Sequence, residues 1–124
     1  MKTYNLVKSV ACGVEKLFDN ISHYLGFIEM GSNDGAEWCL EEIEKDVQDI
    51  KYLINGNEHL LNSDEAEMVK KEMELTFQLT MGLLEMHAND VVNKYGKEEA
   101  KVLVKPLFEL LDKYDVDDEI ISHF

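Results

Sequence analysis

Arginine is absent from this 124-residue chain, and all 12 basic residues are lysines. Arginine supplies the planar fork that binds phosphate and guanine through two hydrogen bonds, and it stabilises the transition state of many phosphoryl transfers. The chain also carries 26 acidic residues, which give a formal net charge of −14. Such a chain repels the phosphates of nucleic acids and of anionic membrane surfaces. We therefore expect no direct binding to nucleic acid and no association with a membrane.

Cysteine and proline are scarce, with two and one residues, and the seven glycines leave little room for long irregular segments. Cys12 and Cys39 are too few for the disulfide framework of a small secreted domain, so we expect free thiols in a reducing compartment. Lys8 interrupts the short apolar run before Cys12, and Ser9 stands where a lipoprotein signal needs a large aliphatic residue. We predict neither a signal peptide nor a membrane span, and we expect the protein in the cytoplasm of a bacterial host cell.

Motifs for catalysis are also missing. The chain has no glycine-rich phosphate loop, no G-x-S-x-G turn and no C-x-x-C pair. His87, with Glu85 and Asp90 near it in the sequence, could act as a general base, but a bundle-edge histidine satisfied by a neighbour is the simpler interpretation. Cys12 lacks the basic partner that activates a nucleophile. We expect a protein that is not an enzyme and needs no cofactor.

Metal sites have little support in the sequence. The stretch GSNDGAEWCLEE at 31–42 places Gly35 and Glu41 at the spacing of an EF-hand calcium loop. The first ligand of that loop would be Met30, which has no oxygen ligand to offer, so we interpret the stretch as a junction between two helices. Acid–histidine pairs at i,i+4 are more often surface contacts than metal ligands; the chain has two, Asp19–His23 and Glu119–His123. We predict no metal site.

Hydrophobic residues make up 45% of the chain, which is enough for one folded domain spanning 1–124. In the first thirty positions they recur at alternating helical spacings and predict a helix with one buried face. This row is Val7, Ala11, Val14, Phe18, Ile21, Leu25 and Ile28. Gly31 is expected to end the helix, because glycine adopts the left-handed conformation of a C-cap without strain.

A second helix is predicted after Gly31. Asp34 followed by Glu37 has the spacing of a capping box, in which each side chain accepts a hydrogen bond from the backbone N–H of the other residue. Asn55–Gly56 is expected to end this helix. Its apolar row is Ala36, Leu40, Ile43, Val47, Ile50 and Ile54.

The third predicted helix begins at Asn62–Ser63 and ends at Gly96, with acidic residues in its first turn, where the helix dipole favours them. Apolar residues cover so much of its circumference between 73 and 88 that we expect this helix to be the central one. Methionines can fill an irregular core or form an adaptable binding surface, and we favour the core. The four in this helix are Met68, Met73, Met81 and Met86.

A fourth helix is predicted from about Lys97 to Tyr114, with Pro106 kinking or restarting it, because the proline ring removes a backbone donor and clashes with the preceding turn. A last short helix is predicted from Asp117 to His123. The single strand-like stretch, AKVLVK at 100–105, is short and flanked by helix formers. We predict an all-α, single-domain antiparallel bundle of four main helices plus a short C-terminal helix.

Acidic residues concentrate in two stretches. Between 34 and 49 there are seven acids and one lysine, and between 109 and 119 there are six acids and one lysine. A net charge of about 2 to 8 suffices to keep a small domain soluble. The excess repulsion destabilises the fold, which favours a functional use of the field. The expected partner-binding residues are Glu37, Glu41, Glu42, Glu44, Asp46, Asp49, Asp115, Asp117, Asp118 and Glu119.

The sequence therefore predicts a non-enzymatic acidic protein that docks on a basic protein surface. One role is an inhibitor that mimics DNA and occupies the groove of a nucleic-acid-binding protein or nuclease complex, as phage anti-CRISPR proteins do. Another is an immunity protein or antitoxin that neutralises a basic toxin. The alternative is a structural subunit or homodimeric scaffold, with the first helix as the self-association seam. We expect docking through the helix carrying residues 37–49, whose apolar row holds its carboxylates at fixed spacing.

Overall fold

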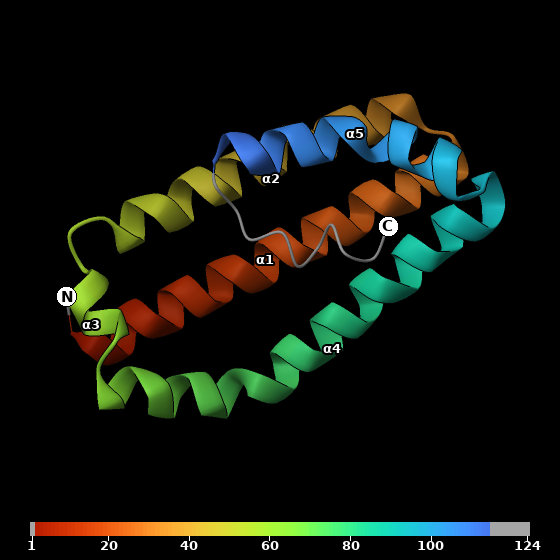
Figure 1. The fold of residues 1–124 in the computed structure, drawn as a ribbon. Coiled ribbons are helices and arrows are strands. Elements are labelled where there is room, and N and C mark those ends of the chain that lie inside the picture. The colour runs from red at the N-terminus through yellow and green to blue at the C-terminus, as the bar shows by residue number, and fades with distance from the viewer. Residues whose placement is uncertain (1, 115–124) are drawn as a thin grey trace.

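The structure, a computed structural model, describes residues 2–114, and every regular element in that range is a helix (Figure 1). The four long helices are α1 (Thr3–Met30), α2 (Asn33–Ile54), α4 (Asp64–Tyr95) and α5 (Lys97–Lys113), and the short α3 (Glu58–Leu61) connects α2 to α4. The predicted all-α bundle is confirmed. The helix predicted at Asp117–His123 lies outside the described residues. None of the helices within residues 2–114 combines the length and the apolar composition that a membrane span requires.

The central helix of the bundle is α1. α2 and α4 pack along opposite sides of α1. α5 folds back from the C-terminal end of α4 and covers that end of the bundle (Figure 1). Consecutive long helices run antiparallel, so α1 and α4 run in the same direction. α1 buries nine of its 28 residues, whereas α4 buries six of 32. The expectation that the helix at 64–95 is central is therefore wrong, because α1 covers only one side of α4.

The junction between α1 and α2 is a glycine C-cap followed by a serine N-cap. Gly31 has a φ of 74°, and its N–H donates to the carbonyl oxygen of Ile28 at 3.1 Å. The hydroxyl of Ser32 accepts a hydrogen bond from the N–H of Gly35 at 3.4 Å. The predicted helix junction is confirmed, but the capping residue is Ser32 rather than Asp34. Asp34 lies in the first turn of α2 instead, where its charge still suits the helix dipole.

The boundaries of α4 and α5 follow the predicted signals. Ser63 caps α4, with its hydroxyl accepting from the N–H of Ala66 at 3.2 Å. Gly96, at a φ of 84°, separates α4 from α5. α5 continues through Pro106 rather than restarting there. Pro106 is exposed, so water can bond the backbone carbonyl that loses its donor to the ring.

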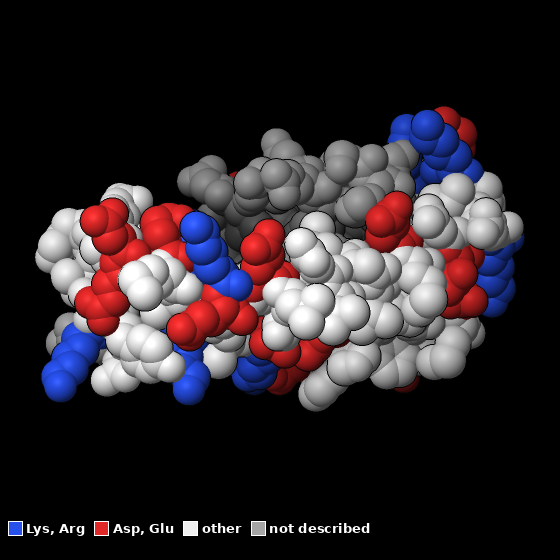
Figure 2. All heavy atoms as spheres, turned by 90° about the horizontal axis from the view of Figure 1, so that it is seen from below, with Lys and Arg blue, Asp and Glu red and all other residues white. Residues whose placement is uncertain are grey.

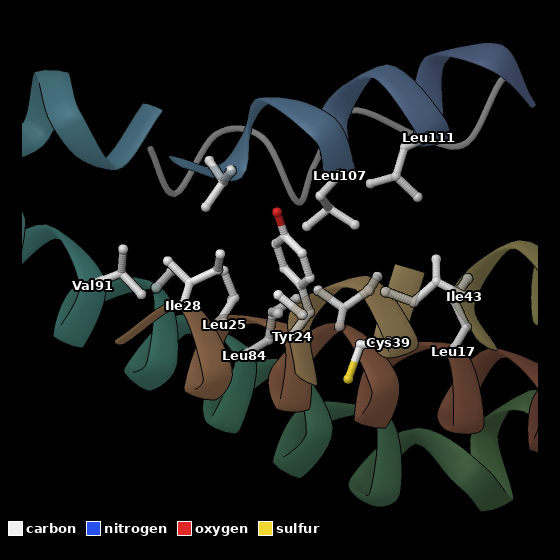
Figure 3. Close-up of a cluster of buried hydrophobic side chains, with 14 of the residues drawn as sticks. Leu17, Tyr24, Leu25, Ile28, Cys39, Ile43, Leu84, Val91, Leu107 and Leu111 are labelled. Carbon is white, nitrogen blue, oxygen red and sulfur yellow. The ribbon is translucent and has the colours of Figure 1, made fainter. Parts of the chain in front are cut away.

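Tyr24 of α1 stands at the centre of the main hydrophobic core (Figure 3). Its ring lies among buried side chains of all four long helices, and its hydroxyl donates to the carbonyl oxygen of Leu103 in α5 at 3.1 Å. Burial first, and the neighbouring Cys39 second, raise the pKa of Tyr24 to about 12. The core around it contains Leu17, Leu25, Ile28, Cys39, Ile43, Leu84, Val91, Leu107 and Leu111.

The outward side of α4 carries a row of exposed apolar side chains. Between Val69 and Thr80 no residue of α4 is buried. Figure 2 looks up at α4 and shows uncharged surface beside a region where acidic and lysine side chains mix. The row, called the α4 apolar row below, is Met68, Leu75, Leu79, Leu83 and Met86, each 48% to 67% exposed. The expectation that the methionines fill the core is therefore wrong for Met68 and Met86.

Candidate functional site

The acidic side chains of α2 lie on two sides of the helix, as their spacing predicts. Glu37, Glu41 and Glu44 form one line, called the outer acidic row below, in which Glu37 and Glu41 are exposed. Within residues 2–114 no lysine lies within ion-pair distance of either of these two carboxylates. Glu44 is half-buried, accepts from the Tyr114 hydroxyl at 3.1 Å and lies 4.0 Å from the ammonium of Lys113. The row thus presents two free carboxylates and one that joins α2 to α5.

The second side of α2 is divided between the surface and the interface with α1. Asp49 is exposed, and no lysine in the described part of the chain pairs with it. Glu42 pairs with Lys45 at 3.3 Å, one turn along the same helix. Glu42 is half-buried and paired, so of these two acids only Asp49 presents an exposed carboxylate without a lysine partner in residues 2–114.

Asp46 is the exception, because it is only 3% exposed. Its Oδ2 accepts a hydrogen bond from the Asn20 amide at 2.6 Å, and its Oδ1 lies 3.3 Å from the Lys16 ammonium. The assignment of Asp46 to a partner-binding surface is therefore corrected: its carboxylate fastens α2 to α1. The sequence pattern does not reveal this role, because Asn20 and Lys16 lie on a different helix. The remaining predicted acids, Asp115, Asp117, Asp118 and Glu119, lie outside the described residues.

A small hollow of about 240 Å³ lies beside the outer acidic row, between α2 and α5. Glu41 and Glu44 form its acidic edge, and Leu40, Pro106 and Leu110 form its apolar wall. This hollow, called the α2–α5 hollow below, places apolar surface next to carboxylates. The combination can receive a side chain that has an aliphatic stem and a cationic end.

A second group of side chains, which could bind a metal ion, lies where α1 packs against α4. Glu29, His87 and Asp90 each offer one atom that can bind a metal, and these atoms lie within 4.8 Å of one another. All three residues are half-buried. The Tyr95 hydroxyl donates to the carbonyl oxygens of Ile28 at 3.1 Å and of Glu29 at 3.2 Å. This bond holds the end of α1 against α4, and so fixes Glu29 close to the two α4 side chains.

The cluster borders a hollow of about 640 Å³ between α1, α2 and α4. Glu29 and His87 line this space together with Ser22, His23, Lys94 and the apolar side chains of Phe27, Met30 and Trp38. Two buried polar atoms there, Ser22 Oγ and His87 Nδ1, have no hydrogen-bond partner among residues 2–114. Ser22 is only 7% exposed. We call this space the histidine hollow; it combines an apolar wall with polar atoms that lack partners.

The sequence indicates part of this cluster. His87 and Asp90 are one turn apart in α4 and were expected near each other, whereas Glu29 is far away in the chain. Glu85, the other expected neighbour of His87, is exposed and does not belong to the cluster. His23 lines the histidine hollow without Asp19, its predicted partner, and the Glu119–His123 pair lies outside the described residues.

The two cysteines are free thiols, Cys12 exposed and Cys39 buried. Burial first, and the charge of Glu42 second, raise the pKa of the Cys39 thiol. Cys39 therefore stays protonated near neutral pH and packs as a small apolar residue. Comparison of this chain with protein-family models, with curated proteins and with solved structures finds no match.

Proposed function

We propose that this chain is a non-enzymatic acidic binding protein that docks on a basic protein surface through the outer acidic row of α2 and through Asp49, which is exposed on the second side of the same helix. The observation that supports this proposal is the exposure of Glu37, Glu41 and Asp49 without a lysine partner in residues 2–114. The net charge of −14 adds a negative electrostatic potential around these carboxylates. A basic partner surface supplies the opposite charge, which speeds encounter and orients the complex.

The rigidity of α2 favours docking over simple solubilisation. Ile43 and Val47 on its inner side are 0% and 2% exposed, so the helix is fixed against the rest of the bundle. Glu37 and Glu41 are four residues apart, which separates them by about 6 Å along the helix axis. Carboxylates held at fixed spacing lose little conformational freedom when a partner binds.

The α2–α5 hollow adds a short-range contact to this long-range attraction. Stable interfaces combine an apolar centre with a polar rim. Leu40, Pro106 and Leu110 offer the apolar part, and Glu41 and Glu44 offer the rim. A partner lysine or arginine that inserts its stem here would place its charge beside the rim carboxylates.

Two biological roles suit this surface. An inhibitor would occupy the nucleic-acid-binding groove of a nuclease or related complex, with carboxylates in the place of phosphates. An immunity protein or antitoxin would cover the basic surface of a toxin. Both roles require a partner with clustered lysine or arginine side chains, and both require binding that weakens as salt screens the charges.

The test uses two variants with equal net charge. The first, Glu37→Lys with Glu41→Lys and Asp49→Lys, reverses the proposed surface. The matched control reverses three exposed acids elsewhere, Asp19, Glu58 and Glu74, to lysine; none of them has an ion-pair partner in the described part of the chain.

We expect the wild type and the control variant to capture the same basic protein from source-cell extract at low salt, and the α2 variant to lose it. The captured protein is identified by mass spectrometry, and binding is then measured with the purified pair. Equal binding of the purified partner to both variants would contradict docking through α2.

A second candidate function, self-association, is favoured by the α4 apolar row. Monomeric proteins rarely expose a continuous apolar surface of more than a few hundred Å², and larger ones mark interaction sites. The first helix, where the sequence placed this seam, offers less apolar surface to a second copy, because most of its apolar row is buried between α2 and α4. We therefore propose that a homodimer would form through α4, with a second copy of the chain as the occupant of the row.

An antiparallel pair of α4 helices, centred on Leu79, would place the row against itself. Lys71 of one copy would then lie close to Glu85 of the other, and the two-fold symmetry of the pair would give two such Lys–Glu ion pairs. Gly82 lies exposed beside the row, and a Cβ added there would meet no atom within 4 Å. Packing within residues 2–114 therefore does not require this glycine, whereas a second helix could approach closely over it.

Sedimentation equilibrium tests the dimer with Leu79→Gln and, as a control, Met30→Gln, which changes an exposed apolar residue outside the row. We expect the wild type and the Met30 variant to associate more tightly as salt is raised, because screening weakens repulsion between two acidic chains. The Leu79 variant should stay monomeric. A wild type that is monomeric at every salt and protein concentration would contradict the homodimer.

A further inference from the structure

We propose that Glu29, His87 and Asp90 form a binding site for a divalent transition-metal cation, with Zn²⁺ as the cation that suits the donors. One imidazole nitrogen and two carboxylate oxygens are ligands that Zn²⁺ accepts readily. The ligand atoms already lie within 4.8 Å of one another, so small rotations of the side chains bring all three onto one ion. This site differs from the sequence-based expectation of no metal and is separate from the outer acidic row.

The backbone holds the three ligands in place before a metal binds. His87 and Asp90 are three residues apart on one helix and therefore project from the same face of α4. Glu29 is held against them by α4, because Lys94 and Tyr95 both donate hydrogen bonds to its carbonyl oxygen. The Lys94 ammonium binds this main-chain oxygen, so the Glu29 carboxylate remains available to a cation.

An independent observation indicates that the site takes a ligand. Ser22 Oγ and His87 Nδ1 are buried polar atoms without a hydrogen-bond partner in the described part of the chain, and both residues line the histidine hollow. Buried polar atoms of folded proteins are nearly always hydrogen-bonded, and an unpaired one is unfavourable. A cation bound to the cluster would be coordinated by the imidazole, and water carried by that cation could hydrogen-bond the Ser22 hydroxyl.

The number of ligands indicates the type of site. Structural zinc sites are closed by four protein ligands, whereas three protein ligands leave a position for water or another small molecule. Glu29 and His87 open onto a hollow of about 640 Å³ with an apolar wall, which has room for such a molecule. The geometry therefore assigns an open metal site rather than a closed structural one.

The experiment is a calorimetric titration of the untagged full chain with Zn²⁺, followed by Co²⁺ absorption spectroscopy as a probe of the ligand set. We expect one saturable Zn²⁺ site in the wild type. Glu29→Gln, His87→Gln and Asp90→Asn should each weaken it by at least about tenfold, since removal of a ligand costs no less than removal of a supporting group. Circular dichroism without metal establishes that each variant is folded, and the folded ones decide the outcome.

Two controls separate the site from adsorption to an acidic protein. A variant with Glu37→Gln, Glu41→Gln and Asp49→Asn removes three acids from α2, and His23→Gln removes a histidine that lines the same hollow outside the cluster. Both should bind Zn²⁺ as the wild type does. The proposal is overturned if the wild type binds no Zn²⁺, if the cluster variants keep wild-type affinity, or if the α2 variant loses it.

Discussion

α2 and α4 lie on opposite sides of α1. Their inner faces are similar, because both are apolar and buried, whereas the outer face of α2 is acidic and that of α4 is apolar. On the inner side, Ile43 of α2 and Leu84 of α4 are 0% and 1% exposed. On the outer side, α2 presents the exposed carboxylates of Glu37 and Glu41, whereas α4 presents Leu79 at 63% exposure. The inner faces are determined by burial against α1. The outer faces are free of that constraint, and their different chemistry is the basis of the two partners that we propose: a basic surface for α2 and a second copy of α4 for α4.

The first prediction, with the largest expected effect, compares inner and outer apolar residues. Ile43→Ala and Leu84→Ala should each lower the free energy of unfolding by about 2–5 kcal/mol, because each leaves a cavity in the core. Leu79→Ala should change it by no more than about 0.5 kcal/mol. Urea unfolding at low protein concentration measures all three. A large loss in the Leu79 variant would show that the outer face of α4 is covered in the folded protein.

The second prediction compares two acids of α2. Asp46→Ala should lower the free energy of unfolding by about 1–3 kcal/mol, because the half-buried Asn20 amide loses its acceptor at the interface between α1 and α2. Lys16 contributes little to this loss, since its side chain is 64% exposed and stays hydrated. Asp49→Ala should have an effect within about 0.5 kcal/mol. Equal effects in the two variants would contradict the assignment of Asp46 to the α1–α2 interface.

These two predictions depend on residues whose roles the sequence reveals to different degrees. Helix ends were predicted well at Gly31, Ser63 and Gly96, because glycine conformation and serine capping act over a few neighbouring residues. The identity of the central helix was not predicted correctly, because it depends on which other helices cover each side of a given helix. A sequence pattern shows that α4 has abundant apolar residues, but not that the described chain leaves one side of them exposed.

The candidate sites show the same limit. Glu37, Glu41 and Asp49 lie at the surface, where their spacing and charge suggested. Asp46 has the same local pattern but meets Lys16 and Asn20 of another helix. Glu29 was missed because it meets His87 only when α1 and α4 pack side by side. Contacts between helices that are distant in sequence could not be predicted without the fold.

The third prediction compares an inner and an outer glycine. A Cβ at Gly35 of α2 would lie 2.5 Å from the Phe27 ring, so Gly35→Ala should lower the free energy of unfolding by about 1–3 kcal/mol. At Gly82 of α4 a Cβ would meet no other side chain or neighbouring helix of residues 2–114 within 4 Å. Gly82→Ala should therefore raise the free energy of unfolding by up to about 1 kcal/mol, because alanine favours the helix. Thermal melts of both variants at low protein concentration measure the difference in the monomer, and a destabilising Gly82→Ala there would contradict the open outer face.

The fourth prediction concerns pH and the core that joins α2 and α4 to α1. Burial raises the pKa of Tyr24 from 10.0 to about 12, so folding favours its protonated form. The resulting stabilisation is complete below pH 10 and is lost as the pH rises from 10 toward 12, because the unfolded chain releases this proton first. Relative to Tyr24→Phe, the wild type should lose stability across this window and not below it. A constant difference between the two proteins up to pH 12 would contradict the burial of the hydroxyl.

The central claim is that the outer acidic row of α2, and not the net charge alone, docks on a basic partner. The most direct measurement is the association rate constant with the captured partner, measured over a range of salt concentrations. For the wild type and for the variant with Asp19, Glu58 and Glu74 changed to lysine, the rate should be high at low salt and fall steeply as salt rises. The variant with Glu37, Glu41 and Asp49 changed to lysine should associate slowly and depend little on salt. Equal rates and equal salt dependence for the two variants would contradict the claim.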